Sequence, residues 1–167
     1  MNEPGTQVRR LTPAAVDAVS ALAREIWQAT YPSLISQAQI DAMLSERYAP
    51  AALRAQLADP AHAWWVARNG SALVGFAHAR ITPPDCKLDK LYVHPHCQRR
   101  GIGRQLFQTV HRWSRQHGAQ RIWLQVNRGN ARAIAAYERY GFRIRESRVF
   151  DIGSGFVMDD HIMEHSV

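Results

Sequence analysis

The chain has 167 residues, of which 46% are hydrophobic and 21% charged, and its formal net charge at pH 7 is +7. This length matches one domain with a single core, so we predict a single domain over residues 1–167. No apolar run approaches the roughly 20 residues of a transmembrane helix, and the polar start lacks the apolar core of a signal peptide. We therefore predict a cytoplasmic protein with no membrane contact.

The first half of the chain alternates between helical and strand-like patterns. Residues 14–30 carry apolar side chains at spacings of three and four, which predicts a helix with one buried face. The dipeptide Asn69-Gly70 is a strong hairpin signal between two β-rich runs. Helices are predicted at 14–30, 36–44 and 50–57, strands at 7–11, 63–68 and 71–81, and a loop at 82–86 with Pro83-Pro84.

The second half alternates strand and helix, which is typical of a parallel strand pair joined by a helical crossover. Strands are predicted at 87–93, 121–126, the residues leading to 150, and 156–164, with helices at 102–117 and 131–140 and a turn at 151–155. Together the elements predict an α/β (α+β) fold. Its centre is a mixed twisted sheet of about seven strands, flanked by helices on both faces.

The most informative motif is Gln98-Arg99-Arg100-Gly101-Ile102-Gly103-Arg104, between a predicted strand and a predicted helix. Two glycines around one apolar residue let the backbone turn tightly, so that successive N–H groups can face one anion. The start of the following helix adds its positive end. Arginine side chains can pair with further phosphates, so we predict a polyanionic ligand with a pyrophosphate at this turn.

A second motif follows the strand at 121–126 and runs from Asn127 to Phe142. With the first motif, it resembles the pattern of the GNAT acetyltransferases, strongly over 88–142 and in the first half only by the order of elements. The matching positions are Gln98, Gly101, Gly103, Asn130, Ala133, Tyr137, Gly141 and Phe142.

The resemblance implies a GNAT fold and acetyl-CoA as co-substrate, with pantetheine between diverging strands at 87–93 and 121–126. A backbone N–H, at Val93, would stabilise the oxyanion. Tyr137 is the expected general acid for the departing thiolate, with aromatic packing as the alternative. Asn130 is expected to contact pantetheine, with helix capping as the alternative. The expected acetyl-CoA-binding residues are Leu91, Tyr92, Val93, Gln98, Arg99, Arg100, Gly101, Ile102, Gly103, Arg104 and Asn130.

The acceptor is expected to be a small primary amine, because residues 151–160 and the Tyr31-Pro32 region resemble small bacterial GNATs grouped with polyamine acetyltransferases. A protein N-terminus or lysine is the alternative acceptor, and a non-catalytic CoA-binding regulator is the alternative class. The general base is left unassigned. Its candidates are Asp85, Asp89, Asp159, Asp160, His78 and His94.

The charge distribution and the positions of cysteine and histidine indicate whether nucleic acid or metal is expected as a partner. Arginines are scattered rather than gathered in a tail or block, so we expect no nucleic-acid partner. Cys86 and Cys97 are expected to be free thiols. His94, His96 and Cys97 lie in one turn without a downstream pair, so we expect no metal. A homodimer is left open, through the last strand if that strand is an exposed edge.

Overall fold

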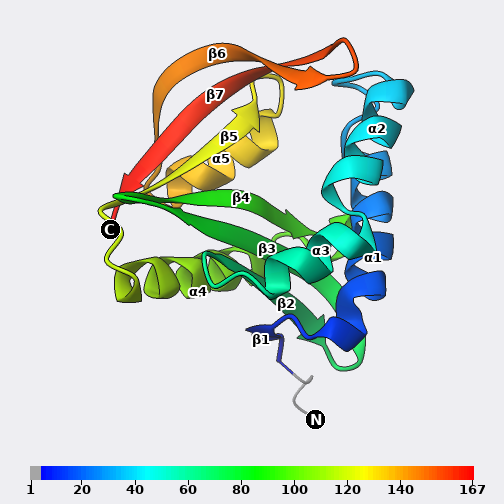
Figure 1. Ribbon diagram of the computed structural model, residues 1–167. Coiled ribbons are helices and arrows are strands. Elements are labelled where there is room, and N and C mark those ends of the chain that lie inside the picture. Colours follow the sequence, from blue (N-terminus) through cyan, green and yellow to red (C-terminus); the bar gives the residue numbers. More distant parts are fainter. Residues whose placement is uncertain (1–4) are drawn as a thin grey trace.

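The computed structural model describes residues 5–167 and contains one seven-stranded sheet of order β1-β2-β3-β4-β5-β7-β6 (Figure 1). Residues 1–4 of the predicted polar start lie outside the described residues. The strands are β1 Gln7–Arg10, β2 His62–Asn69, β3 Ala72–Thr82, β4 Asp85–Val93, β5 Arg121–Asn127, β6 Arg143–Gly153 and β7 Phe156–Ser166. The helices are α1 Val16–Thr30, α2 Gln37–Arg47, α3 Pro50–Leu57, α4 Ile102–Gln116 and α5 Ala131–Arg139, with 3-10 turns at Pro13–Ala15 and Pro95–Cys97. The predicted mixed sheet flanked by helices is confirmed.

The sheet separates two hydrophobic clusters. Trp64 and Phe76 pack with α1, α2 and α3 on one face, whereas Trp65 and Leu124 pack with α4 and α5 on the other. The neighbouring tryptophans of β2 enter opposite clusters because successive side chains of a strand point to opposite faces. The sheet is therefore buried on both sides, and within residues 5–167 no helix is long and apolar enough to cross a membrane.

The sheet opens between β4 and β5. These two strands are parallel and pair only at Cys86↔Ile122 and Lys87↔Trp123. Beyond Lys87, β4 continues beside β3, while β5 continues beside β7. Figure 1 shows β5, β7 and β6 diverging from β4. The divergence that the resemblance implied is therefore present, and it leaves one edge of the end of β4 free of strand partners among the described residues.

The predicted loop at 82–86 was wrong, because it is mostly strand. Thr82 of β3 pairs with Asp85 of β4, so Pro83 and Pro84 alone form the turn of a hairpin. Proline lacks an N–H group, and a turn is a place in a hairpin where this group is not needed by the ladder. The helix predicted at 36–44 also continues further, to Arg47.

The last strand is not an edge of the sheet. β7 lies between β5 and β6, and β6 occupies the edge. The expectation that the last strand could pair between subunits was therefore wrong. The long β6–β7 hairpin returns the chain into the sheet, so that the backbone groups of β7 are used on both sides.

Candidate active site

A cleft of about 1550 Å³ follows the opening between β4 and β5. Its lining includes every residue predicted to bind acetyl-CoA except Arg100, whose side chain is exposed outside it, and it also includes Tyr137. We call the part formed by α5 and by residues 98–104 other than Arg100 the glycine end. The opposite part, with Arg47, Lys87, Asp89 and Asp160, is the carboxylate end.

The glycine end presents the start of α4. Gly101 is the N-cap residue with φ +78°, a left-handed conformation that favours glycine, and no side chain caps the helix. A Cβ added to Gly103 would lie 2.7 Å from Tyr140 Oη, so this position also has no room for a side chain unless the tyrosine moves. The first N–H groups of α4 are thus left without intrahelical acceptors in a wall of the cleft, which suits an anion.

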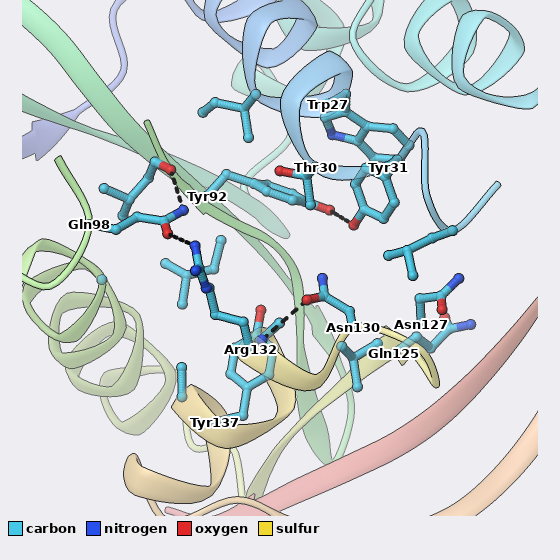
Figure 2. Close-up of a pocket in the computed structure, with 18 of the residues that line it drawn as sticks. Trp27, Thr30, Tyr31, Tyr92, Gln98, Gln125, Asn127, Asn130, Arg132 and Tyr137 are labelled. Atoms are coloured by element: carbon cyan, nitrogen blue, oxygen red, sulfur yellow. Dashed lines mark hydrogen bonds between the residues drawn. The ribbon is translucent and has the colours of Figure 1, made fainter. Parts of the chain in front are cut away.

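Gln98 joins the two sides of the opening. Its Nε2 donates to the carbonyl oxygen of Val93 at 3.2 Å, and its Oε1 accepts from Arg132 Nη1 at 3.1 Å (Figure 2). Arg132 and Arg139 also line the cleft, and the sequence analysis missed both. A signal was available for Arg132, because a cation in the first turn of a helix opposes the helix dipole. An anionic ligand would offset that repulsion.

Asn130 and Tyr137 lie on the α5 side of the cleft (Figure 2). Asn130 Oδ1 accepts from Ala133 N at 3.2 Å, so the capping alternative is present. The Tyr137 ring packs edge-on against Phe142 with centroids 5.7 Å apart. Burial raises the pKa of Tyr137, so its hydroxyl keeps its proton at neutral pH and can donate it or hydrogen-bond through it.

Aromatic side chains cover the cleft from α1. The hydroxyls of Tyr31 and Tyr92 are hydrogen-bonded at 2.8 Å, which links the end of α1 to β4 (Figure 2). Trp27 packs on Tyr31 with ring centroids 4.3 Å apart. In the sequence analysis Tyr31 directly follows the helix predicted at 14–30 and belongs to the subgroup resemblance, and periodicity carries no signal for its contact with Tyr92.

Of the six candidate bases, only Asp89 and Asp160 line the cleft. Asp85 is 3.4 Å from Arg121 Nε, and Asp159 is 3.1 Å from Arg128 Nη2. His94 is 3.5 Å from Glu25, and His78 is buried behind Asp89. Asp89 and Asp160 are therefore the two remaining candidates for the general base.

Asp89 is surrounded by donors because β4 bulges there. His78 pairs with Lys90 and Ala79 with Leu88, which leaves Asp89 as the extra residue. Asp89 Oδ2 accepts from Lys90 Nζ at 2.6 Å, from His78 Nδ1 at 3.1 Å and from Arg47 Nη2 at 3.3 Å. Burial alone would raise the pKa of Asp89, but the charge of Lys90, the His78 hydrogen bond and the charge of Arg47 hold it well below its usual range.

Burial also shifts the pKa values of residues around Asp89. Burial lowers the pKa of His78 to about 4 and that of Lys90 to about 8. His78 is thus neutral at pH 7. Lys87 is 3.4 Å from Asp89 Oδ1 and donates to Gln125 Oε1 at 2.6 Å, which ties β4 to β5 at the base of the opening.

Asp160 is only 5% exposed, and its Oδ1 has no hydrogen-bond partner among the described residues. Burial raises its pKa to about 6.

Cys86 and Cys97 are free thiols, as predicted. Within residues 5–167, no group of three His, Cys, Asp or Glu side chains is arranged to hold a metal ion.

Known proteins share this sequence and fold. Residues 20–142 match the acetyltransferase (GNAT) family. The chain is 30% identical over 139 residues to the uncharacterized N-acetyltransferase Rv2669 of Mycobacterium tuberculosis H37Rv. The aligned residues cover 83% of this chain and 89% of that protein. The chain therefore belongs to the GNAT family and is an N-acetyltransferase, as its motifs indicated.

Two further comparisons come from Thermoplasma acidophilum. Its spermidine N(1)-acetyltransferase is 24% identical over 157 residues, which cover 92% of this chain and 95% of that protein. The crystal structure of PaiA N-acetyltransferase in complex with coenzyme A superposes with a TM-score of 0.85 at 23% identity, and covers 98% of this chain and 99% of that chain. The structural similarity confirms the GNAT fold.

Proposed function

We propose that the protein transfers the acetyl group of acetyl-CoA to a primary amine of a small molecule, with polyamines as the first acceptor class. The observation that carries this proposal is the continuous cleft. It joins an uncapped helix start at the glycine end to a buried carboxylate at the other end, Asp160.

The glycine end suits the phosphates of CoA. The free N–H groups at the start of α4 would bind the pyrophosphate, and Arg99, Arg104 and Arg132 would add charge-assisted contacts. The free edge of β4 from Leu91 to Val93 offers backbone groups to the pantetheine amides, in the manner of an added strand. Asn130 would contact pantetheine while it caps α5.

The reaction would proceed by direct attack of the amine on the thioester carbonyl. The backbone N–H of Val93 would stabilise the oxyanion, and Tyr137 would give its proton to the departing thiolate. The nitrogen, which must lose a proton to become an amide, would then return one to Tyr137. Burial keeps the Tyr137 hydroxyl protonated at neutral pH but raises its pKa further above that of a thiol near 8.5, so the transfer to sulfur would be concerted or take the form of a hydrogen bond.

The acceptor class is supported by the carboxylates of the cleft and by one relative. Asp160 lies within the cleft, and the exposed Glu46 and Asp151 line it as well, which suits a molecule with several ammonium groups. Asp159 pairs with Arg128 instead and does not line the cleft. The relative named spermidine N(1)-acetyltransferase aligns over almost the whole chain.

Thiol release from acetyl-CoA tests the proposal, with spermidine, spermine, amino acids and short peptides as acceptors. We expect spermidine-dependent release, and a fall in kcat of about 10²- to 10⁴-fold in Tyr137→Phe with little change in acetyl-CoA affinity. Release with peptides alone would support the protein-acetyltransferase alternative. Acetyl-CoA binding without release for any acceptor would favour a regulator, and absence of binding would contradict the proposal.

A further inference from the structure

The carboxylate end of the cleft contains two carboxylates with opposite surroundings, the half-buried Asp89 and the buried Asp160. Asp89 on β4 has its oxygens within 3.4 Å of Lys87, Lys90, Arg47 and His78. Asp160 on β7 lines the same cleft, and its Oδ1 is buried without any hydrogen-bond partner among residues 5–167. A buried polar atom that the protein leaves unpaired calls for an explanation, and a ligand that donates to it is one.

Asp89 is a poor proton acceptor for a substrate. Its Oδ2 already accepts from Lys90, His78 and Arg47, and its Oδ1 is 3.4 Å from Lys87 Nζ. Three of these four neighbours are cationic side chains: Lys87, Lys90 and Arg47. Protonating the carboxylate would leave those cations, of which Lys90 is buried, without a counter-charge. Asp89 is therefore suited to holding the cations of the cleft wall in place.

The groups around Asp160 leave its buried Oδ1 without a partner among the described residues. Its register partner on β5 is Asn127, and its partner on β6 is Arg148, which donates instead to Glu146 at 2.8 Å. Arg47 from α2 and Lys87 from β4 are near enough to lower its pKa, and the neighbouring Asp159 raises it. Burial outweighs these charges, and neither cation forms an ion pair with Asp160 in the described residues.

We propose that Asp160 binds the ammonium group of the acceptor and takes the proton that the amine must lose. This inference rests on the proposed amine acetylation. The ammonium gives one proton to the Asp160 carboxylate, and the neutral nitrogen attacks the thioester carbon. The carbon–nitrogen bond forms, the carbon–sulfur bond breaks, and a second N–H proton ends on the thiolate, with Tyr137 as the relay. Asp160 then releases its proton to solvent, so one proton is produced per acetylation.

The charges of the cleft assist this transfer. A free amine has a pKa near 10.4, so it is almost wholly protonated at pH 7. Burial of the ammonium close to Arg47 and Lys87 disfavours its charged form and lowers its pKa towards that of the carboxylate. With a pKa of about 6, Asp160 is ionised at pH 7 and ready to accept the proton.

The pH profile of kcat/KM for spermidine tests the assignment. If the enzyme binds spermidine in its ammonium form and itself supplies the base, kcat/KM is constant between about pH 7 and 9. It falls below about pH 6, where the base becomes protonated. An enzyme without that base selects the rare neutral amine, so its kcat/KM rises tenfold per pH unit towards the pKa of the amine near 10.4. We expect the plateau in the wild type and the continuous rise in Asp160→Asn, with a loss of about 10²- to 10⁴-fold at pH 7.

The matched control is Asp159→Asn, which removes the same charge from the next residue on an exposed side chain paired with Arg128. It should keep the plateau. Asp160→Glu should also keep it at a lower rate. If Asp160→Asn does not fold, Asp160→Ala, which also lacks the carboxylate, replaces it. A plateau in Asp160→Asn, or a continuous rise in the wild type, would overturn the assignment.

Amine acetylation by the wild type, together with acetyl-CoA binding measured by calorimetry, separates failure of the Asp160 assignment from failure of the proposed function. If the wild type binds acetyl-CoA and acetylates amines but Asp160→Asn has the wild-type profile, only the role of Asp160 is wrong. If the wild type acetylates no amine, the proposed function itself fails.

Discussion

Asp89 and Asp160 have opposite effects on the free energy of unfolding. Asp89 forms ion pairs with three cations, whereas Asp160 Oδ1 has no hydrogen-bond partner among the described residues. Asp160 has a folded-state pKa of about 6, above the ordinary value near 3.8. Its ionisation therefore destabilises the fold progressively as pH rises from about 4 to 6, and the full penalty is present above pH 6. Two pKa units correspond to roughly 3 kcal/mol.

Asp160→Asn should therefore increase the free energy of unfolding at pH 8 by up to about 3 kcal/mol, and should change it little at pH 3.5, where Asp160 is protonated in both states. Urea denaturation at the two pH values measures this difference. Lower stability of the variant at pH 8 would mean that a structural partner of Asp160 had been lost. Stabilisation together with lost activity is expected of a residue kept for function.

Asp89→Asn should do the opposite. The pKa of Asp89 is depressed in the folded state, so its contribution to stability is present above the ordinary pKa near 4 and is lost as pH falls below it. At pH 7 the substitution leaves Lys87, Lys90 and Arg47 without their shared counter-charge, and we expect a loss of about 3–5 kcal/mol. Thermal and urea unfolding at pH 7 measure it. A loss below about 1 kcal/mol would show that the cations do not depend on Asp89.

At the scale of elements, the start of α5 serves both the fold and the proposed cofactor contact. Asn130→Ala removes the hydrogen bond to Ala133 N and should lower stability by about 1 kcal/mol. It should also raise the KM for acetyl-CoA. The matched control is Ser36→Ala, because Ser36 caps α2 by accepting from Gln39 N at 3.1 Å and does not line the cleft. Equal stability losses with unchanged KM in both variants would leave Asn130 a cap alone.

Sequence patterns predicted the elements whose signals are local. The turn at Gly101, the start of α5 at Asn130 and the hairpin predicted at Asn69-Gly70 depend on conformations that neighbouring residues set, and all three are present. The hairpin turn lies one residue later than predicted, at Gly70 and Ser71, because Asn69 pairs with Ala72. The prediction of a loop at 82–86 was wrong because it gave Pro83 and Pro84 more weight than the strand-forming residues around them. The two prolines occupy only the turn, and the residues on either side of it pair as strands.

Long-range contacts explain what the sequence could not reveal about the site. The sequence left six candidates for the general base. Three of them form ion pairs with arginines that are distant in sequence or lie outside their own strand: Asp85 with Arg121, Asp159 with Arg128 and Asp89 with Arg47. The bulge that places Asp89 and Lys90 side by side depends on the register with β3. Which carboxylate remains unpaired becomes visible only when the whole sheet is assembled.

At the scale of the whole molecule, the net charge of +7 acts in opposite directions on the two proposed substrates. Acetyl-CoA carries several negative charges and would be attracted by the protein and by arginines at the glycine end, such as Arg99 and Arg104. A polyamine is repelled at long range and attracted only close to the carboxylates of the cleft. Salt screens exposed charges beyond a Debye length of about 10 Å at 0.1 M, and about 3 Å at 1 M.

Raising the salt concentration from 0.05 to 0.5 M should therefore raise the KM for acetyl-CoA several-fold, because its phosphate contacts are weakened. The KM for spermidine should stay constant or fall, because the long-range repulsion is screened while contact with the buried Asp160 is screened much less. Steady-state kinetics with each substrate varied in turn measures both constants, and a neutral salt series with two different anions excludes competition by one ion. A parallel rise in both constants would show that exposed carboxylates such as Glu46 and Asp151, rather than a buried one, hold the acceptor.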